Sequence, residues 1–241
     1  MFAGGMTELP ENLFANPVWH ALHSKHRKFA KCVGDACRYP ADVVPLAAIK
    51  APELDAMRQL RSLFEAGESP WVIGEEYAEV SGLVREETLE CIQMVLPEGV
   101  GVPETENEIV KLSDANAHEM VALTTLAFPG FFRQRTCEMG AYFGVRSASG
   151  ELIAMGGERL KLDGFTEISA VCTHPSFRGR GLAAGIIWQL AREHRKDGVV
   201  SWLHVASTNR RAAALYLRMG FKEVRKVILH RVSRVSQTDK M

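Results

Sequence analysis

The stretch Thr173-His-Pro-Ser-Phe-Arg-Gly-Arg-Gly-Leu-Ala183 decides how this chain is interpreted. It connects a predicted strand at 165–173 to a predicted helix at 181–195. Its glycines let main-chain N–H groups approach a ligand closely, and a helix N-terminus adds about half a positive charge. The turn therefore suits a phosphate or a diphosphate, with an ordinary tight turn as the alternative. It lacks the residues that define a Walker loop or a three-glycine dinucleotide turn.

The pattern around this turn predicts the fold class. Upstream, a helix at 114–128, capped by Ser113 or Asp114, accompanies predicted strands at 108–112, 141–146, 151–155, 158–162 and 165–173. Asp163-Gly164 suits a type I′ hairpin turn, so the last two of these strands are antiparallel. Downstream, the pattern indicates a strand at 199–206, a helix at 209–219, and one or two strands within 222–232. Because a short helix joins strands 165–173 and 199–206, they run parallel, and we predict a mixed α/β sheet covered by helices.

The first hundred residues have a weaker pattern and no chemical motif. They predict strands at 42–49 and 71–73 and a helix at 53–66. The Pro- and Gly-rich segment 97–106 predicts a domain boundary. We therefore expect an N-terminal α/β region of unknown role at 1–105, a second domain at 106–235 and a frayed tail at 236–241, with fraying already from Ser233.

Composition restricts the class of protein. The chain has 241 residues, of which 46% are apolar and 24% charged, which is typical of a globular protein. No apolar run approaches the roughly 20 residues that cross a bilayer, and the N-terminus does not resemble a signal peptide. We expect a cytoplasmic protein without membrane partners. Five cysteines at irregular spacing favour reduced thiols, and Cys32 and Cys37 lack a second pair, so we predict no metal site.

The charge is distributed unevenly along the chain. Residues 1–175 hold 15 Lys and Arg against 25 Asp and Glu, whereas residues 176–241 hold 14 against 4. The basic C-terminal part either meets an anion or pairs with the acidic remainder. Nucleic acid is disfavoured as a partner, because the basic part has no interleaved aromatic residues and no nucleic-acid-binding motif.

A second informative stretch runs from Asn209 to Phe221. Asn209, Ala212 and Tyr216 share one face of the predicted helix, and the alanine leaves room for a ligand between the two polar side chains. The alternative is a helix packed through its alanines, with Asn209 acting only as the N-cap.

Together these two stretches resemble the GNAT superfamily of acyl-CoA-dependent N-acyltransferases. Arg178, Gly181 and Ala183 match its Arg/Gln-x-x-Gly-x-Gly/Ala motif, and "NRRAAALYLRMGF" matches its second motif throughout. The resemblance covers roughly residues 108–232. The wording "EISAVCTHP" and the additional N-terminal half look most like the glycine-acyltransferase-like branch.

The resemblance implies how acetyl-CoA would bind. The cofactor would lie between strands 165–173 and 199–206, which splay apart in this family. Main-chain groups of one strand would pair with the pantetheine arm, amides of the glycine-rich turn would hold the diphosphate, and residues of the last helix would contact the thiol end. In that order, the implied residues are Val171, Cys172, Thr173, Arg178, Gly179, Arg180, Gly181, Leu182, Ala183, Asn209 and Tyr216.

The same resemblance implies the catalytic groups. Tyr216 occupies the position of the family's acid, which protonates the departing thiolate, with mere packing on the cofactor as the alternative. The base is open between Glu167, which shares a strand face with Thr173 unless a bulge intervenes, and His204, which stands where ribosomal-protein acetyltransferases have a glutamate. A water chain is an alternative base, and Glu158 is a third candidate after Glu167 and His204. Cys172 is expected to be a small strand residue and no nucleophile.

We therefore expect an enzyme that transfers an acetyl group from acetyl-CoA to a primary amine of a small molecule or amino acid, by direct attack in a ternary complex. The alternatives are a protein N-terminal acetyltransferase, a non-catalytic acyl-CoA sensor and a nucleotide-binding regulator. No metal is expected, and the sequence is compatible with a homodimer without deciding the oligomeric state.

Overall fold

The computed structural model describes residues 10–65, 67–74, 77–127 and 129–235. The elements before residue 100 are α1 (Glu11–Ala15), α2 (Pro17–His23), the 3-10 turn η1 (Arg27–Phe29), β1 (Lys31–Val33), β2 (Ala36–Arg38), β3 (Leu46–Ile49), α3 (Leu54–Ser62), β4 (Trp71–Ile73) and β5 (Leu83–Val95). Those after it are β6 (Val110–Leu112), η2 (Asp114–Asn116), α4 (Ala117–Ala127), η3 (Thr136–Met139), β7 (Tyr142–Arg146), β8 (Leu152–Leu162), β9 (Phe165–Thr173), η4 (Pro175–Phe177), α5 (Leu182–Lys196), β10 (Val200–Ala206), α6 (Arg210–Arg218) and β11 (Lys222–Arg234).

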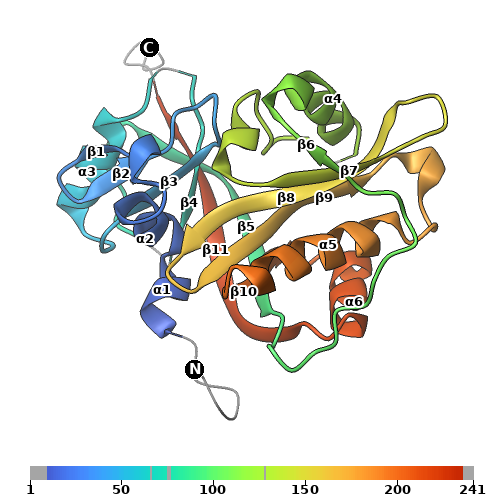
Figure 1. Ribbon diagram of the computed structural model, residues 1–241. Helices are drawn as coiled ribbons and strands as arrows, with labels where there is room; N and C mark the ends of the chain where they lie inside the picture. Colours follow the sequence, from blue (N-terminus) through green and yellow to red (C-terminus); the bar gives the residue numbers. More distant parts are fainter. Residues whose placement is uncertain (1–9, 66, 75–76, 128, 236–241) are drawn as a thin grey trace.

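The described strands form one mixed sheet of eleven, in the order β1-β2-β3-β4-β11-β5-β10-β9-β8-β7-β6 (Figure 1). The pairs β3–β4 and β9–β10 are parallel, and the other neighbours are antiparallel. This confirms the mixed α/β sheet and the parallel pair on either side of α5.

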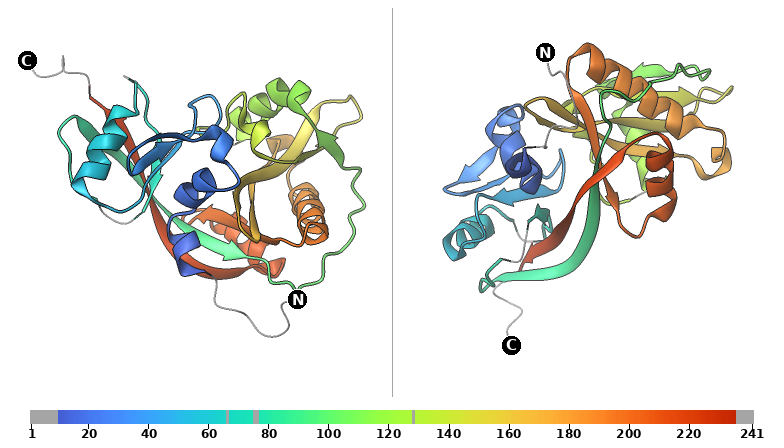
Figure 2. Two further views of the ribbon diagram at one scale, coloured as in Figure 1. Left: turned by 60° about the vertical axis from the view of Figure 1, so that its left-hand side comes forward. Right: turned by 90° about the horizontal axis from the view of Figure 1, so that it is seen from below.

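The long strands β5 and β11 join the two ends of the sheet. Figure 2 shows them as a twisted ribbon between the N-terminal elements and the rest of the protein. Although β5 precedes the boundary predicted at residue 105, it lies between β10 and β11. Side chains cross the same line, since the ring of Phe14 packs edge-on against Trp202 with centroids 5.0 Å apart. The segments 1–105 and 106–235 therefore share one sheet and one hydrophobic core.

Helices cover both faces of the β7–β9 part of the sheet (Figure 1). On one face, α5 buries Leu182, Ile186 and Leu190, whose spacing of four residues places them on one side of the helix. On the other face, α4 buries Met120 and Leu123. Both helices are thus held by apolar burial against neighbouring strands.

Most predicted elements are present, with several differences in extent. The strands predicted at 71–73 and 165–173 are β4 and β9. The strands predicted at 151–155 and 158–162 are a single strand, β8, and 222–232 is the single strand β11, which includes Ser233 and Arg234 from the segment predicted to fray. The helix predicted at 53–66 ends at Ser62, and the one predicted at 114–128 begins as the 3-10 turn η2; residue 128 and the tail 236–241 lie outside the described residues. The strand β5 was not predicted.

The expectation of reduced cysteines is wrong for one pair. Cys32 and Cys37 lie directly opposite each other on β1 and β2, with Cα atoms 4.1 Å apart, and form a disulfide. Cys91, Cys137 and Cys172 are free. Among the described helices, none has the length and apolar character needed to cross a bilayer.

Candidate active site

A cavity of about 690 Å³ opens where β9 and β10 separate. The parallel ladder between these strands has three residue pairs and ends at Trp202 and Glu167, while β10 continues along β5 as far as Ala206. Beyond this point, the β9 residues from Ile168 to Thr173 line the cavity. The separation leaves main-chain groups on one edge of β9 available to a ligand, which strand pairing would otherwise occupy.

A bulge in β9 turns its backbone beside the cavity. The register against β8 shifts between the pairs Met155–Cys172 and Gly157–Ser169. Ala170, between them, has a φ of 54°, in the left-handed region that an alanine seldom adopts. A bulge re-aims the side chains that follow it, so Glu167 and Thr173 do not share a face by simple alternation. Nothing in the local sequence marks this bulge.

The glycine-rich turn forms one end of the cavity. Gly179 and Gly181 have φ values of 82° and 74°, and a Cβ added to either would meet no atom within 4 Å. These glycines serve the backbone conformation and open space, with Gly181 as the N-cap of α5. The first N–H groups of a helix have no partner within it, and among the described residues no side chain caps those of α5, so they can meet an anion.

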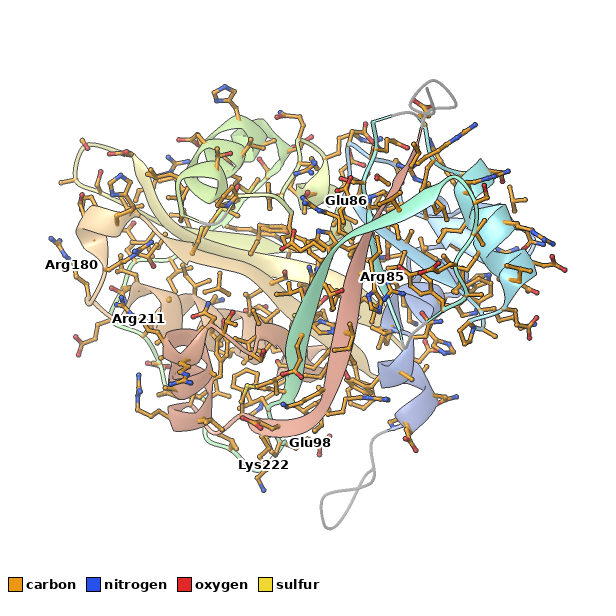
Figure 3. The ribbon with its side chains drawn as sticks, turned by 180° about the vertical axis from the view of Figure 1, so that it is seen from behind. Arg85, Glu86, Glu98, Arg180, Arg211 and Lys222 are labelled. Atoms are coloured by element: carbon orange, nitrogen blue, oxygen red, sulfur yellow. A yellow bond between two sulfur atoms is a disulfide. The ribbon has the colours of Figure 1, made fainter. Side chains whose placement is uncertain are left out.

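Arginines line the cavity at the turn and along α6. Arg178 and Arg180 come from the turn, and Arg211 and Arg218 from α6. Figure 3 shows Arg180 and Arg211 on the same side of the molecule. The guanidinium of Arg180 also lies over the ring of Phe177, 4.9 Å from its centroid. The basic C-terminal charge seen in the sequence is therefore concentrated partly at this opening.

The helix α6 contributes Asn209 and Tyr216. The Asn209 Oδ1 accepts a hydrogen bond from the Ala212 N–H at 3.2 Å, so Asn209 is the N-cap and also lines the cavity. Tyr216 is half-buried, with its ring 5.8 Å from that of Phe221. Burial raises the pKa of Tyr216 to about 12, so the phenol is protonated at neutral pH. Among the described residues, none forms a hydrogen bond with its hydroxyl.

The far end of the cavity contains a buried polar network. The Arg159 Nε and Nη2 donate to the Glu167 carboxylate at 2.9 and 2.6 Å, and the His204 Nδ1 lies 2.7 Å from Glu167 Oε1. Gln93 Nε2 donates to the Phe14 carbonyl at 2.9 Å and lies 3.0 Å from His204 Nε2. The carboxylate of Glu167 faces Nδ1 and the amide of Gln93 faces Nε2, so both ring nitrogens of His204 are engaged.

This network counts against Glu167 as the base. The Glu167 side chain is fully buried and is not part of the cavity lining. Although burial opposes ionisation, the charges of Arg159 and His204 and their hydrogen bonds lower its pKa to about 2. A carboxylate held in this way accepts protons poorly. His204 does line the cavity, but its two ring nitrogens are both engaged.

The surroundings of Glu158 and Cys172 make neither residue a base or nucleophile. Glu158 is buried and bonds the Ala141 N–H, the His194 ring and Lys161. Burial raises its pKa, but these partners outweigh burial and lower it to about 2. Burial raises the pKa of Cys172 to about 12, so its thiol is not a nucleophile at neutral pH.

Sequence reasoning missed several residues of the cavity. Among the described residues that line it, none is an aspartate or glutamate, whereas five are arginines. Counting back from the Asp163-Gly164 turn sets Leu160 opposite Glu167 and Arg159 next to that pair, which is the sequence signal for the contact between Arg159 and Glu167. No comparable pattern in the sequence indicates that residues of β5 and β11 line the cavity. The lining residues that the sequence patterns did not indicate include Leu89, Cys91, Phe131, Arg159, Arg211, Arg218 and Leu229.

Comparison with known proteins identifies the family. The family model described as FR47-like protein matches residues 142–229. A GNAT-family protein from Novosphingobium aromaticivorans, known from its crystal structure, is 31% identical; the match covers 92% of this chain and 99% of that one, with a TM-score of 0.84. A GCN5-related N-acetyltransferase from Kribbella flavida is 18% identical and shares the fold, with a TM-score of 0.62 over 92% of this chain and 96% of that one. A search of curated proteins found no significant match.

The chain therefore belongs to the GNAT acetyltransferase family. Enzymes of this family take the acetyl group from acetyl-CoA and pass it to an acceptor. The resemblance seen in the two sequence motifs is confirmed at the level of the family, and the fold is that of its solved structures.

Proposed function

We propose that this enzyme acetylates the amine of a small molecule that carries a carboxylate, such as an amino acid, by direct attack in a ternary complex. The observation that carries the proposal is a single cavity bounded by the glycine-rich turn, by Tyr216 and by Arg159. An amino-acid acceptor agrees with the predicted likeness to the glycine-acyltransferase-like branch. Membership of that branch, location in the cytoplasm and the formation of a homodimer are predictions from the sequence.

The residues present fit acetyl-CoA. Gly179 and Gly181 have open space beside them, and the first N–H groups of α5 have no side-chain cap, so residues 178–183 would hold the diphosphate. The separated edge of β9 would offer the main-chain groups of Val171, Cys172 and Thr173 to the pantetheine arm. Asn209 would contact the arm through its Nδ2, since its Oδ1 caps α6.

The bound thioester supplies an activated acetyl group, and the protein supplies hydrogen-bond donors. A main-chain N–H of β9 near Cys172 would stabilise the developing oxyanion. The Tyr216 hydroxyl would donate a hydrogen bond to the departing sulfur. A thiol has an ordinary pKa of about 8.5, so complete proton transfer from a phenol with a pKa of about 12 would be uphill by about 5 kcal/mol. We therefore assign Tyr216 a hydrogen bond that stabilises the leaving thiolate.

We infer that the amine loses its proton without a protein base in direct contact. Glu167 is paired with Arg159, and both nitrogens of His204 are engaged. If the amine enters neutral, the proton that it loses equals the one that the thiolate gains, so the reaction needs no net proton acceptor. In this proposal the Arg159–Glu167–His204–Gln93 network positions the cavity wall, and solvent carries the proton.

Charge favours an acceptor with a carboxylate. Arg159 lines the far end of the cavity, and Glu167 occupies only its Nε and Nη2. Among the described residues, none accepts a hydrogen bond from its Nη1, which is therefore available to an anion. An acceptor with several positive charges would find no acidic partner among the lining residues. Leu89 and Cys91 of β5 add apolar walls, so the N-terminal segment would help to select the acceptor.

Replacing Gly181 by valine tests the site. A β-branched residue is strained at a φ of 74°, and its side chain would fill the open space beside the turn. We expect the Kd for acetyl-CoA, measured by calorimetry, to rise by at least about tenfold, which corresponds to about 1.4 kcal/mol. The matched control is Gly150→Val, because Gly150 has a φ of 86° and open space but lies outside the cavity lining.

The controls also separate the rival functions. Equal acetyl-CoA affinity in the wild type and the Gly181→Val variant would show that the turn does not hold the cofactor. ATP or NAD binding in place of acetyl-CoA would favour the nucleotide-binding regulator. Binding of acetyl-CoA without release of CoA, across a panel of amino acids, other amines and peptide N-termini, would favour the acyl-CoA sensor; release with peptides alone would favour a protein N-terminal acetyltransferase.

A further inference from the structure

A cluster of one imidazole and two sulfur atoms lies outside the cavity, at the start of the sheet. A ring nitrogen of His23, Cys32 Sγ and Cys37 Sγ all lie within 4.8 Å of one another. None of the three residues lines the cavity of the proposed active site. The cluster therefore concerns a different part of the molecule.

The hairpin of β1 and β2 fixes the two cysteines. Gly34 and Asp35 form its two-residue turn, and the φ of 54° at Gly34 suits that turn. The turn is anchored by a hydrogen bond from the Asp35 N–H to Gln59 Oε1 at 2.8 Å. Cys37 is fully buried and Cys32 is exposed, so the pair has one side toward the core and one toward solvent.

The helix α2 fixes the imidazole. His23 Nδ1 lies 2.8 Å from the Trp19 carbonyl, and because a carbonyl only accepts, Nδ1 carries the proton of the neutral ring. The Trp19 ring also stacks on that of His23, with centroids 3.9 Å apart. The lone pair of Nε2 is left free, and Nε2 lies 3.9 Å from Cys37 Sγ. A histidine that ligates a metal is commonly oriented in this way, by donating its other N–H to a carbonyl.

We propose that the reduced protein binds one thiophilic divalent cation of the Zn²⁺ class through His23, Cys32 and Cys37. Thiolate and imidazole ligands at about 2.3 and 2.1 Å from Zn²⁺ lie roughly 3.5 to 3.8 Å from each other in a tetrahedral site. The observed separation of 3.9 Å between Cys37 Sγ and His23 Nε2 is close to this value. Because Cys32 and His23 are exposed, water completes the coordination.

The disulfide makes the site dependent on redox state. A dithiol reductant gives the Cys32–Cys37 bond two electrons and two protons, and itself becomes a disulfide. Binding of the cation then releases the two thiol protons, because the thiolates are the ligands. The oxidised pair offers no thiolate, so disulfide formation and metal binding exclude each other.

The test uses the full chain, reduced with a phosphine, freed of metal by a chelator and titrated with Co²⁺ without oxygen. We expect thiolate charge-transfer absorption and the visible bands of tetrahedral Co²⁺, saturating at one equivalent and displaced by Zn²⁺. The oxidised protein should show neither. Cys32→Ser and His23→Gln should each weaken Co²⁺ binding by at least about tenfold. Cys137→Ser, which changes a free cysteine elsewhere, should bind as the wild type does.

His23→Gln is the decisive variant, because it leaves the disulfide and the hairpin intact. Thermal denaturation of the oxidised form should show that its fold is unchanged. If reduced wild type shows no tetrahedral Co²⁺ spectrum, the proposal is overturned. It is equally overturned if His23→Gln binds Co²⁺ as tightly as the wild type, since the imidazole would then be a bystander beside a structural disulfide.

Discussion

The buried ion pair between Arg159 and Glu167 makes a quantitative prediction about stability. The Glu167 side chain is fully buried and that of Arg159 is 12% exposed. Replacing Glu167 by glutamine would leave the guanidinium buried without a compensating charge, a change that costs about 3 to 5 kcal/mol in proteins. The pKa of Glu167 points the same way, because a decrease from 4.5 to about 2 corresponds to roughly 3 kcal/mol.

The assay is urea and thermal unfolding of Glu167→Gln beside the wild type. For a chain of this length, we expect the Tm to fall by roughly 6 to 20 °C. Glu193→Gln is the matched control, because Glu193 pairs with Lys196 at the surface and its replacement should change the stability by no more than about 0.5 kcal/mol. A loss below about 1 kcal/mol for Glu167→Gln would refute the reasoning, since it falls outside the range for a broken buried pair.

The pH dependence supplies an internal check on this pair. Because the folded pKa of Glu167 lies below its ordinary value, its contribution to stability is complete well above pH 4.5 and is lost as the pH falls toward 2. Between pH 7 and pH 4, the difference in stability between the wild type and Glu167→Gln should shrink by roughly 1 kcal/mol. A difference that grows on acidification would contradict the assigned direction of the shift.

Three other predictions concern activity and folding. Tyr216→Phe should lower kcat by roughly 10²-fold with little change in the acetyl-CoA Kd, and unchanged turnover would remove the role of the hydroxyl. The kcat/KM for an amino acid should rise with its free-amine fraction, in parallel for the wild type and His204→Gln; a break near pH 6.5, seen only in the wild type, would make His204 the base. Residues 106–241 alone should fail to fold, because they lack β5; a folded, active fragment, judged by circular dichroism and CoA release, would contradict this.

The sequence predicted the conformation of the glycine-rich turn and of α6 in the candidate site because the determinants of both are local. Gly179 and Gly181 are needed for a backbone that only a few residues can form, and the helix start follows at once. Asn209 and Tyr216 lie on one short helix, where spacing alone decides which residues share a face. Such features do not depend on how distant segments pack.

The acceptor end depends on pairing between distant segments, so local patterns did not reveal it. The charged start of β5, including Arg85 and Glu86, does not resemble a strand in the middle of a sheet. Arg85 pairs with Val232 of β11, and Glu86 falls at the register shift that follows Arg231, whereas among the described strands β10 pairs with β5 only from Cys91 to Val95 (Figure 3). The bulge at Ala170 likewise depends on the register with β8, which periodicity cannot supply.

The measurement that tests the central claim most directly is a crystal structure of the protein with CoA. We predict that the diphosphate lies within about 2.7 to 3.2 Å of main-chain nitrogens between Gly179 and Ala184, with the sulfur beside the Tyr216 hydroxyl. A CoA molecule bound away from the opening between β9 and β10, or a Tyr216 hydroxyl directed away from the sulfur, would contradict it.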